Sequence, residues 1–518
     1  MYDAILISTH YNYGNDGTMI PPQNAEDYDN LSYIIPLGII QIAQYLHDSG
    51  FKVRVVHIPH EMHTLKWIGI SEDQIENPVE KILREYPAHL CGIQAHFYLY
   101  CGGAVFVSNL YKKLFPHSKI FLGGYMATAC WKQFLNASKD IDGVILGEGE
   151  KTFKIILQRY LTSSRCDLTD VAGIAFREST GDLIYNPPRE DSVLKLDEIP
   201  IIHPDSSPFE NIIWQRRQSI NISRGLCPEK CSYCVGNNKA LNPRAYQTLQ
   251  IDKILEQIRV YQEYGFHELF LGENHFLNTP FMMDLLDNII RENLTLHYEL
   301  ETHPIIFEDR DLLGKMIRAK FLRYTMGCES GSNSLLKRIG RNSSSRLIID
   351  SVKRIAEMGG IVLTSWISNL PGETYAEFQE TQELMRYVVK MGGFIYWIEN
   401  LHVLPGSRLY EKPRDWDIEV LLNNLEDWIR WSVISKKYVA FEEAYKEPLN
   451  YLTHLNRNIS PEEMIERFYS NRKLAVSLIP DMKFNLENRI KYLPPHILEA
   501  EMQGIDWYES KGWKLWLF

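Results

Sequence analysis

Three of the eight cysteines of this 518-residue chain fall within one short segment. Cys227, Cys231 and Cys234 have the spacing Cys-x3-Cys-x2-Cys in Ser-Arg-Gly-Leu-Cys-Pro-Glu-Lys-Cys-Ser-Tyr-Cys. Thiolates at this spacing can ligate three corners of a [4Fe–4S] cluster, which leaves the fourth iron open to a substrate or cofactor. The alternatives are a structural zinc site and chance clustering of the cysteines. Zinc prefers four ligands, so His275 or Cys328 would have to complete it.

The cysteine spacing resembles that of the radical S-adenosylmethionine (SAM) enzymes. In that family SAM chelates the open iron, and the reduced cluster cleaves it to a 5′-deoxyadenosyl radical. The resemblance implies that Tyr233 lies near the adenine of SAM. It implies further SAM contacts at polar residues that follow the later strands: Glu273, Asn274, Glu301, Glu329, Ser330 and Asn369. Asn369 stands where the family's Gly-Leu-Pro-Gly-Glu-Thr segment begins with glycine, and Glu329 alone is equally compatible with capping a helix.

Glycines recur at predicted strand ends in the first 165 residues. They allow the backbone to approach a large flat ligand, and backbone N–H groups at helix starts bind phosphate. Their ordered segments resemble the cobalamin-binding domain that is fused to many radical SAM enzymes. The resemblance implies cobalamin contacts at Gly38, Gln94, Gly123, Gly124, Thr128, Gly147 and Glu148. The alternative is that these glycines only make tight turns between strand and helix.

The segment after the first predicted strand is Ser8-Thr-His-Tyr-Asn-Tyr-Gly14. It lacks the Asp-x-His-x-x-Gly pattern with which many other cobalamin proteins place a histidine on the lower face of cobalt. The resemblance to the radical SAM branch therefore implies no histidine–cobalt bond. His10 is expected to contact the corrin edge or to close a loop.

Two series of alternating strand and helix patterns must position these residues. Residues 4–160 predict five buried strands in a doubly wound, flavodoxin-like parallel sheet. Six later strands, from 218 to 402, are too few for an eight-stranded barrel and predict a partial (β/α)6 barrel. The rest is expected to be mainly helical. We therefore expect a cobalamin-binding domain at 1–165, a hairpin and linker at 166–215, a radical SAM domain at 216–415 and a C-terminal domain at 416–518.

Composition excludes several classes of protein. With 45% hydrophobic and 23% charged residues, the chain is globular rather than disordered. Its formal net charge of −11 argues against a general nucleic-acid binder. The sequence shows neither a membrane span nor the basic start of a signal peptide, and the cysteines are too few for a disulfide scaffold. We expect a cytoplasmic protein.

Together the two resemblances imply a cobalamin-dependent radical SAM methyltransferase that acts on an unactivated carbon of a small molecule or natural product. The implied cofactors are a [4Fe–4S] cluster, SAM and cobalamin, and the reaction would use methylcobalamin together with the 5′-deoxyadenosyl radical. An electron donor such as flavodoxin or ferredoxin is the implied partner. One alternative is a ring rearrangement or cyclisation without methyl transfer. Another is an iron–sulfur and cobalamin sensor without catalysis.

The substrate is expected to contact the strand ends of the barrel and the C-terminal segment. Tyr396 and Glu399 are the candidates for catalytic residues, and Trp397 lies between them. An aromatic group near the C-terminus is interpreted as core packing: Trp507, Tyr508, Trp513 and Trp516.

Overall fold

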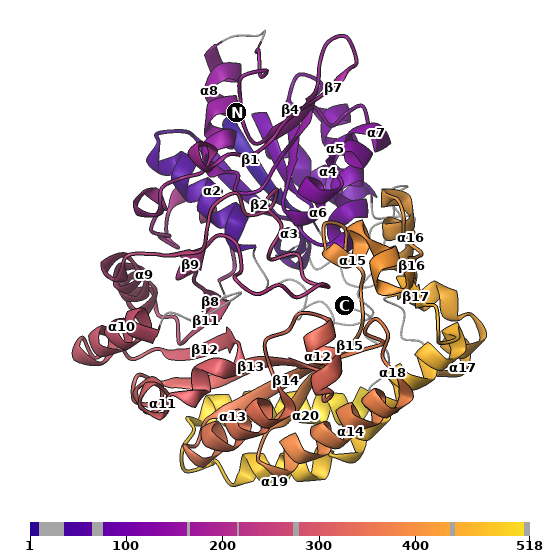
Figure 1. Ribbon diagram of the computed structural model, residues 1–518. Helices are drawn as coiled ribbons and strands as arrows, with labels where there is room; N and C mark the ends of the chain where they lie inside the picture. The colour runs from indigo at the N-terminus through magenta and orange to yellow at the C-terminus, as the bar shows by residue number, and fades with distance from the viewer. Residues whose placement is uncertain are drawn as a thin grey trace.

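A computed structural model describes residues 1–9, 36–64, 76–162, 166–214, 217–272, 279–435 and 441–511. These residues form two large sheets with surrounding helices and a mainly helical C-terminal part (Figure 1). Trp507 and Tyr508 lie on the last helix. Several predictions lie outside the described residues: those for His10, Glu273, Asn274, His275, Trp513 and Trp516.

The N-terminal sheet has the strand order β2-β1-β3-β4-β5-β6-β7. Its first five strands are parallel, which confirms the doubly wound prediction. The strands are β1 Tyr2–Ser8, β2 Val53–His57, β3 Ala88–Gln94, β4 Lys119–Gly123, β5 Gly143–Ile145, β6 Ile174–Arg177 and β7 Leu183–Asn186.

Helices cover both faces of this sheet. Successive residues of β1 show why: Leu6 packs into the core that contains α2 and α8, whereas Ile7 packs into the core that contains α4 and α5. A strand buried on both faces is a continuous apolar run, as observed. The helices are α2 Leu37–Asp48, α3 Ile58–Thr64, α4 Glu76–Arg84, α5 Cys101–Leu114, α6 Tyr125–Ala129, α7 Trp131–Ala137 and α8 Glu150–Thr162.

The predicted hairpin is formed by β6 and β7, and it continues the N-terminal sheet. β6 pairs antiparallel with β5, so the sheet extends beyond the expected domain end at residue 165. Ile174 and Phe176 are buried in the core of this domain. A two-stranded hairpin cannot bury such side chains by itself, and pairing with β5 does so.

The central sheet is a parallel, open six-stranded sheet in the order β15-β14-β13-β12-β11-β8, in agreement with the predicted partial barrel. Its strands are β8 Arg217–Ser219, β11 Glu268–Gly272, β12 His297–Thr302, β13 Phe321–Glu329, β14 Ile361–Ser368 and β15 Phe394–Asn400. The helices between them are α9 Ile251–Tyr264, α10 Thr279–Arg291, α11 Arg310–Arg318, α12 Asn333–Arg338, α13 Ser345–Glu357 and α14 Tyr375–Lys390. Between β8 and α9, β9 Ser223–Arg224 pairs with β10 Gln247–Thr248.

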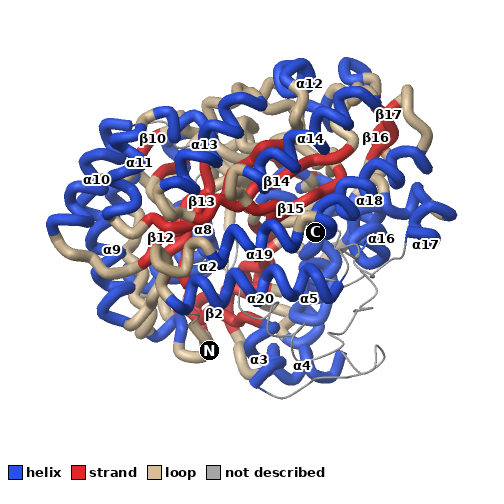
Figure 2. Tube along the Cα trace, turned by 90° about the horizontal axis from the view of Figure 1, so that it is seen from below, coloured by secondary structure: helices blue, strands red, loops and turns tan. Residues whose placement is uncertain are grey.

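The C-terminal part contacts both the N-terminal domain and the central sheet. Helix α16 packs against α5 of the N-terminal domain, whereas α18 packs against β14 and β15. Helices α19 and α20 cross the underside of the molecule (Figure 2), where Arg323 of β13 forms a 2.6 Å ion pair with Glu501 of α20. The elements are α15 Arg408–Glu411, β16 Ile418–Val420, α16 Leu425–Ser435, α17 Phe441–Lys446, β17 His454–Asn456, α18 Pro461–Ser477, α19 Ile479–Glu487 and α20 Pro495–Lys511. Within the described ranges, no helix has the length and apolar character that crossing a membrane requires.

Candidate functional site

The carboxyl ends of the strands in the two sheets face each other. Beyond β3, the hydroxyl of Tyr98 lies 3.4 Å from Nδ1 of His402, which follows β15. Beyond β4, the hydroxyl of Tyr125 donates a hydrogen bond to the carbonyl of Pro405, again beyond β15. Parallel α/β sheets bind ligands at this edge. Ligands held by the two sheets would therefore lie next to each other.

The cysteine triplet occupies the loop that follows β9. Cys227 and Cys231 are buried, and Cys234 is exposed. Burial raises the pKa of the Cys227 thiol to about 12, and the neighbouring thiols of Cys234 and Cys231 contribute to this rise. The structure therefore brings the three cysteines together.

Gly236 holds this loop in shape. Its N–H donates to Cys234 Sγ at 3.3 Å, and its carbonyl accepts from the N–H of Cys227 at 3.0 Å. A Cβ at Gly236 would lie 3.3 Å from Cys227 Cβ and 3.5 Å from Cys234 Sγ. Glycine thus keeps a close space open between two of the cysteines, and an N–H donor to sulfur is a feature of iron–sulfur sites. These residues fit a cluster.

The ligand assignment itself stays a prediction. Among the residues that the structure describes, no three His, Cys, Asp or Glu side chains converge as the ligands of one metal ion. A [4Fe–4S] cluster makes a different demand, because each thiolate ligates a different iron.

A buried polar group lies beside the cysteines at the end of β13. The Tyr233 hydroxyl donates to the carboxylate of Glu329, whose pKa is raised by burial. The guanidinium of Arg341 donates to the Cys231 thiol and, at 2.7 Å, to the carbonyl of Gly327. Two predicted SAM contacts, Tyr233 and Glu329, are therefore adjacent. Sequence reasoning missed Arg341, because it follows α12 with no motif of its own.

Glu329 also has an unusual backbone. Its φ of 64° is left-handed, and the ladder from β13 to β14 shifts register between Gly327 and Glu329. A non-glycine residue in this region carries strain, and such residues cluster at ligand sites.

Asn369, another predicted SAM contact, is bonded within the protein. Its Nδ2 donates to Asn400 Oδ1 and to the carbonyl of Met464, both at 2.8 Å. Its backbone N–H donates to Glu373 Oε2 at 3.1 Å. Both side-chain N–H donors are therefore committed, and Asn369 joins the ends of β14 and β15 to α18.

Ser330 and Glu301, two further predicted SAM contacts, differ in the accessibility of their side chains. The Ser330 hydroxyl lies 3.0 Å from Thr381 Oγ1 and accepts from the N–H of Ser332, so it orients the turn after β13. Glu301 is exposed at the end of β12. Of these two predicted SAM contacts, Glu301 has the more accessible side chain.

Two of the predicted cobalamin glycines leave open space. A Cβ at Gly38, where α2 begins, or at Gly123, where β4 ends, would meet no atom of the described residues within 4 Å. Gly124 differs, because its φ is 106° and a Cβ would lie 2.9 Å from His96 Cα. The open backbone at Gly38 and Gly123 fits a bulky ligand, whereas Gly124 is required by the turn itself.

The polar residues predicted to contact cobalamin already have protein partners. Gln94 Oε1 accepts from the Ser8 hydroxyl at 3.0 Å. The Thr128 hydroxyl accepts from the N–H of Gly147 at 3.0 Å and donates to a backbone carbonyl. Glu148 is engaged by two arginines of the central domain.

The two catalytic candidates lie on β15. Tyr396 is 38% exposed. Glu399 accepts from Trp397 Nε1 at 2.8 Å, and its other oxygen lies 3.4 Å from Nε2 of His402. Burial raises the pKa of Glu399 well above its usual value and lowers that of His402 to about 3, so burial favours the uncharged form of each group.

Comparison with known proteins gives two family matches that follow one another along the chain. Residues 31–157 match the B12 binding domain, and residues 221–385 match the radical SAM superfamily.

Two curated relatives cover much of the chain. An uncharacterized methyltransferase of Pyrococcus horikoshii is 25% identical, over 79% of this chain and 83% of its own. The anaerobic magnesium-protoporphyrin IX monomethyl ester cyclase of Synechocystis is 22% identical, over 68% of each chain.

Among solved structures, the radical SAM methyltransferase TsrM of Kitasatospora setae, with cobalamin and a [4Fe–4S] cluster bound, has a similar fold. The TM-score is 0.65 at 13% identity, and the match covers 92% of this chain and 89% of TsrM.

Proposed function

Because this chain is a cobalamin-dependent radical SAM enzyme, with a B12 binding domain and a radical SAM domain in one polypeptide, we propose that it transfers a methyl group to an unactivated carbon of a small-molecule or natural-product substrate. The observation that carries the proposal is the opposition of the two sheet edges. Tyr98 and Tyr125 of the N-terminal domain each touch the segment beyond β15. Ligands at the two edges would then react without crossing bulk water, which limits side reactions.

When bound, the cluster would supply the electron that cleaves SAM, and cobalamin would carry a methyl group taken from SAM. Cys227, Cys231 and Cys234 would hold the cluster, with Gly236 donating to Cys234 Sγ. Tyr233 and Glu329 would position SAM, and the exposed carboxylate of Glu301 would be available to its charged amine.

On the other side of the site, Gly38 and Gly123 would admit cobalamin, because no atom of the described residues crowds the backbone at either position. Tyr396 would touch the substrate, since this residue is 38% exposed on β15. Glu399 lies on the same strand, and burial favours its uncharged form, which suits a substrate with a neutral polar group better than one with a charge.

The relatives support more than one outcome. The Pyrococcus horikoshii relative is named a methyltransferase, which favours methyl transfer. The Synechocystis relative is named a cyclase, which keeps a ring-forming reaction without methyl transfer as the second candidate. The electron donor, such as flavodoxin or ferredoxin, and the cytoplasmic location stay predictions.

The test uses the holoenzyme, reduced under anaerobic conditions and supplied with SAM. Methyl transfer through cobalamin predicts two products from SAM: S-adenosylhomocysteine when cobalamin is methylated, and 5′-deoxyadenosine when the radical forms. A cyclase without methyl transfer gives 5′-deoxyadenosine alone. Formation of 5′-deoxyadenosine with no S-adenosylhomocysteine would therefore replace the proposal by the second candidate.

A further inference from the structure

Two arginines of the radical SAM domain are enclosed by side chains of the B12 binding domain. Arg224 donates through Nη1 to Glu148 Oε2 at 2.7 Å, and through Nη2 to Glu150 Oε1 and Gln41 Oε1, both at 2.8 Å. Arg244 donates to both oxygens of Glu148, at 2.8 Å from Nε and 2.7 Å from Nη2. We call these five residues the latch.

The latch is buried. Its four charged side chains keep between 4% and 13% of their surface exposed. A buried ion pair adds little net stability over an apolar contact, but loss of one partner leaves a buried charge uncompensated. Arginine also holds carboxylates in a fixed bidentate geometry. The latch is therefore built to specify one relative position of the domains.

On the radical SAM side, the latch anchors the base of the cysteine loop. Arg224 precedes Cys227 by three positions. The N–H of Leu226 donates to the carbonyl of Arg244 at 3.0 Å, so the two arginines lie on paired segments. Gly225, with φ of 108°, allows this closeness, because a Cβ there would lie 2.2 Å from the carbonyl oxygen of Ala245.

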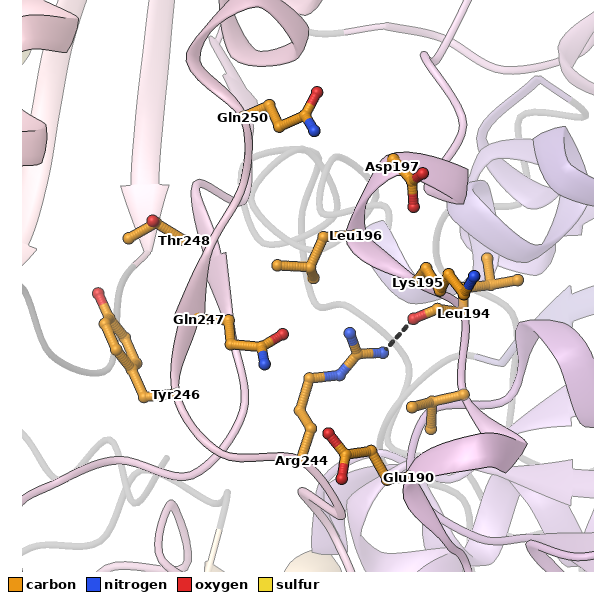
Figure 3. A pocket seen from close by; sticks show the side chains of 11 residues that line it. Glu190, Leu194, Lys195, Leu196, Asp197, Arg244, Tyr246, Gln247, Thr248 and Gln250 are labelled. Carbon is orange, nitrogen blue, oxygen red and sulfur yellow. Dashed lines mark hydrogen bonds between the residues drawn. The ribbon is translucent and has the colours of Figure 1, made fainter.

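Arg244 has a further contact with the linker between the domains. Its Nη2 donates to the carbonyl of Leu194 at 2.6 Å (Figure 3). Arg244 is also among the residues around a pocket of about 600 Å³, which linker residues such as Leu194 and Asp197 line together with Tyr246 and Gln250. The guanidinium is thus held by Glu148 on one side and by the linker on another.

On the B12 binding side, the latch residues lie at the carboxyl edge of the sheet. Glu148 follows β5, and Gln41 lies one turn into α2. Gly147 lies so close to the radical SAM domain that a Cβ would be 3.1 Å from the carbonyl oxygens of Ala240 and Leu241. The segment from Gly147 to Glu150 therefore contacts the other domain.

We propose that the latch fixes the cysteine loop relative to the carboxyl edge of the N-terminal sheet, and that Arg224, Arg244, Glu148 and Glu150 are positioning residues for reaction between ligands of the two domains. The inference rests on the proposed function. It gives Glu148 a role that differs from the one expected from sequence, because both of its oxygens bind arginine rather than remaining available to cobalamin.

Two variants test the latch. Glu148→Gln keeps the shape and removes the charge. Arg224→Lys keeps the charge but cannot reach Glu148, Glu150 and Gln41 together. In the chain without cofactors, amide hydrogen exchange over residues 223–249 should become about tenfold faster or more in either variant, since the base of the loop opens more often. Asp170→Asn is the matched control, because it removes an exposed ion pair with Arg159 in the B12 binding domain and should leave this exchange unchanged.

The second readout uses the loaded enzyme without substrate. Cob(II)alamin and the reduced cluster are both paramagnetic, so the spin relaxation of cob(II)alamin reports their separation. Each latch variant should retain cobalamin and about four irons, while the spin relaxation of its cob(II)alamin slows relative to wild type and Asp170→Asn.

Weaker cobalamin binding by Glu148→Gln, with unchanged hydrogen exchange at 223–249, would make Glu148 a cobalamin ligand and overturn the latch. Unchanged exchange and relaxation in both variants would overturn it as well. Failure of the wild type to bind cobalamin would contradict the proposed function instead, and the exchange measurement would still test the latch.

Discussion

The phenol of Tyr98, beyond β3, lies 3.4 Å from the imidazole of His402, beyond β15. The same ring lies 3.4 Å from Glu399 on its other side. A buried row of polar side chains therefore runs from the N-terminal sheet into the barrel, and Trp428 and Trp431 of α16 pack around Tyr98.

The state of Glu399 gives the first prediction. Because burial favours its protonated carboxyl, Glu399→Gln should have a free energy of unfolding within about 1 kcal/mol of wild type at pH 7. The amide oxygen can still accept from Trp397 Nε1, and the amide N–H would face the His402 ring. Denaturant unfolding measures the difference. A loss of several kcal/mol would show that Glu399 is a charged carboxylate with a partner.

Glu373 gives a prediction on pH. Burial raises its pKa to about 7 from the usual 4.5, so the folded chain keeps a proton that the unfolded chain releases. The stability of the wild type should therefore fall relative to Glu373→Gln as pH rises from 4.5 to 7, and the difference should be constant above that range. The total change in relative stability across this range should be about 3 kcal/mol, because the pKa of Glu373 rises from 4.5 to about 7 on folding. Parallel stability curves for the two proteins over this range would contradict the assignment.

The cysteines give the third prediction. Alanine at Cys227, Cys231 or Cys234 should abolish the cluster absorbance of anaerobically reconstituted protein, which should otherwise bind about four irons. Cys166→Ala is a suitable control, because Cys166 is also partly accessible and lies outside the loop. Loss of the cluster in Cys328→Ala alone would mean that the ligand set is wrong.

The neighbouring glycines Gly123 and Gly124 give the fourth prediction. Gly123→Leu should fold and lose cobalamin, since a side chain there meets open space at the end of β4. Gly124→Ala should destabilise the domain by about 1 kcal/mol or more, because its φ is 106° and its Cβ meets His96. Equilibrium binding of cobalamin and thermal unfolding separate the two effects. Native-like Gly123→Leu that still binds cobalamin tightly would exclude this position from the site.

The sequence predicted the parts of the fold that local patterns determine. Buried strands such as β1 and the alternation of strands with helices in both parallel sheets follow from apolar runs that alternate with helical patterns. The hairpin at β6 and β7 was found, but its pairing with β5 depends on a tertiary contact that no local pattern encodes.

The candidate site was predictable where residues lie together in sequence. The cysteine loop is the clear case. Asn369 and Glu148 carry family motifs, yet their side chains bond to Met464 and Arg244, which are distant along the chain. Arg224, Arg244 and Arg341 were missed because an arginine becomes informative only when its buried partners are known.

The most direct test of methyl transfer follows a label from SAM into product. The reduced holoenzyme would receive SAM with a deuterated methyl group, together with a small-molecule extract of the cells that produce the enzyme. Mass spectrometry would then search for a labelled product. Radical methyl transfer predicts a new compound carrying the intact labelled methyl, formed together with 5′-deoxyadenosine and S-adenosylhomocysteine and absent from the Cys231→Ala variant. A labelled product formed without 5′-deoxyadenosine would contradict the radical step, and 5′-deoxyadenosine with an unlabelled product would contradict methyl transfer.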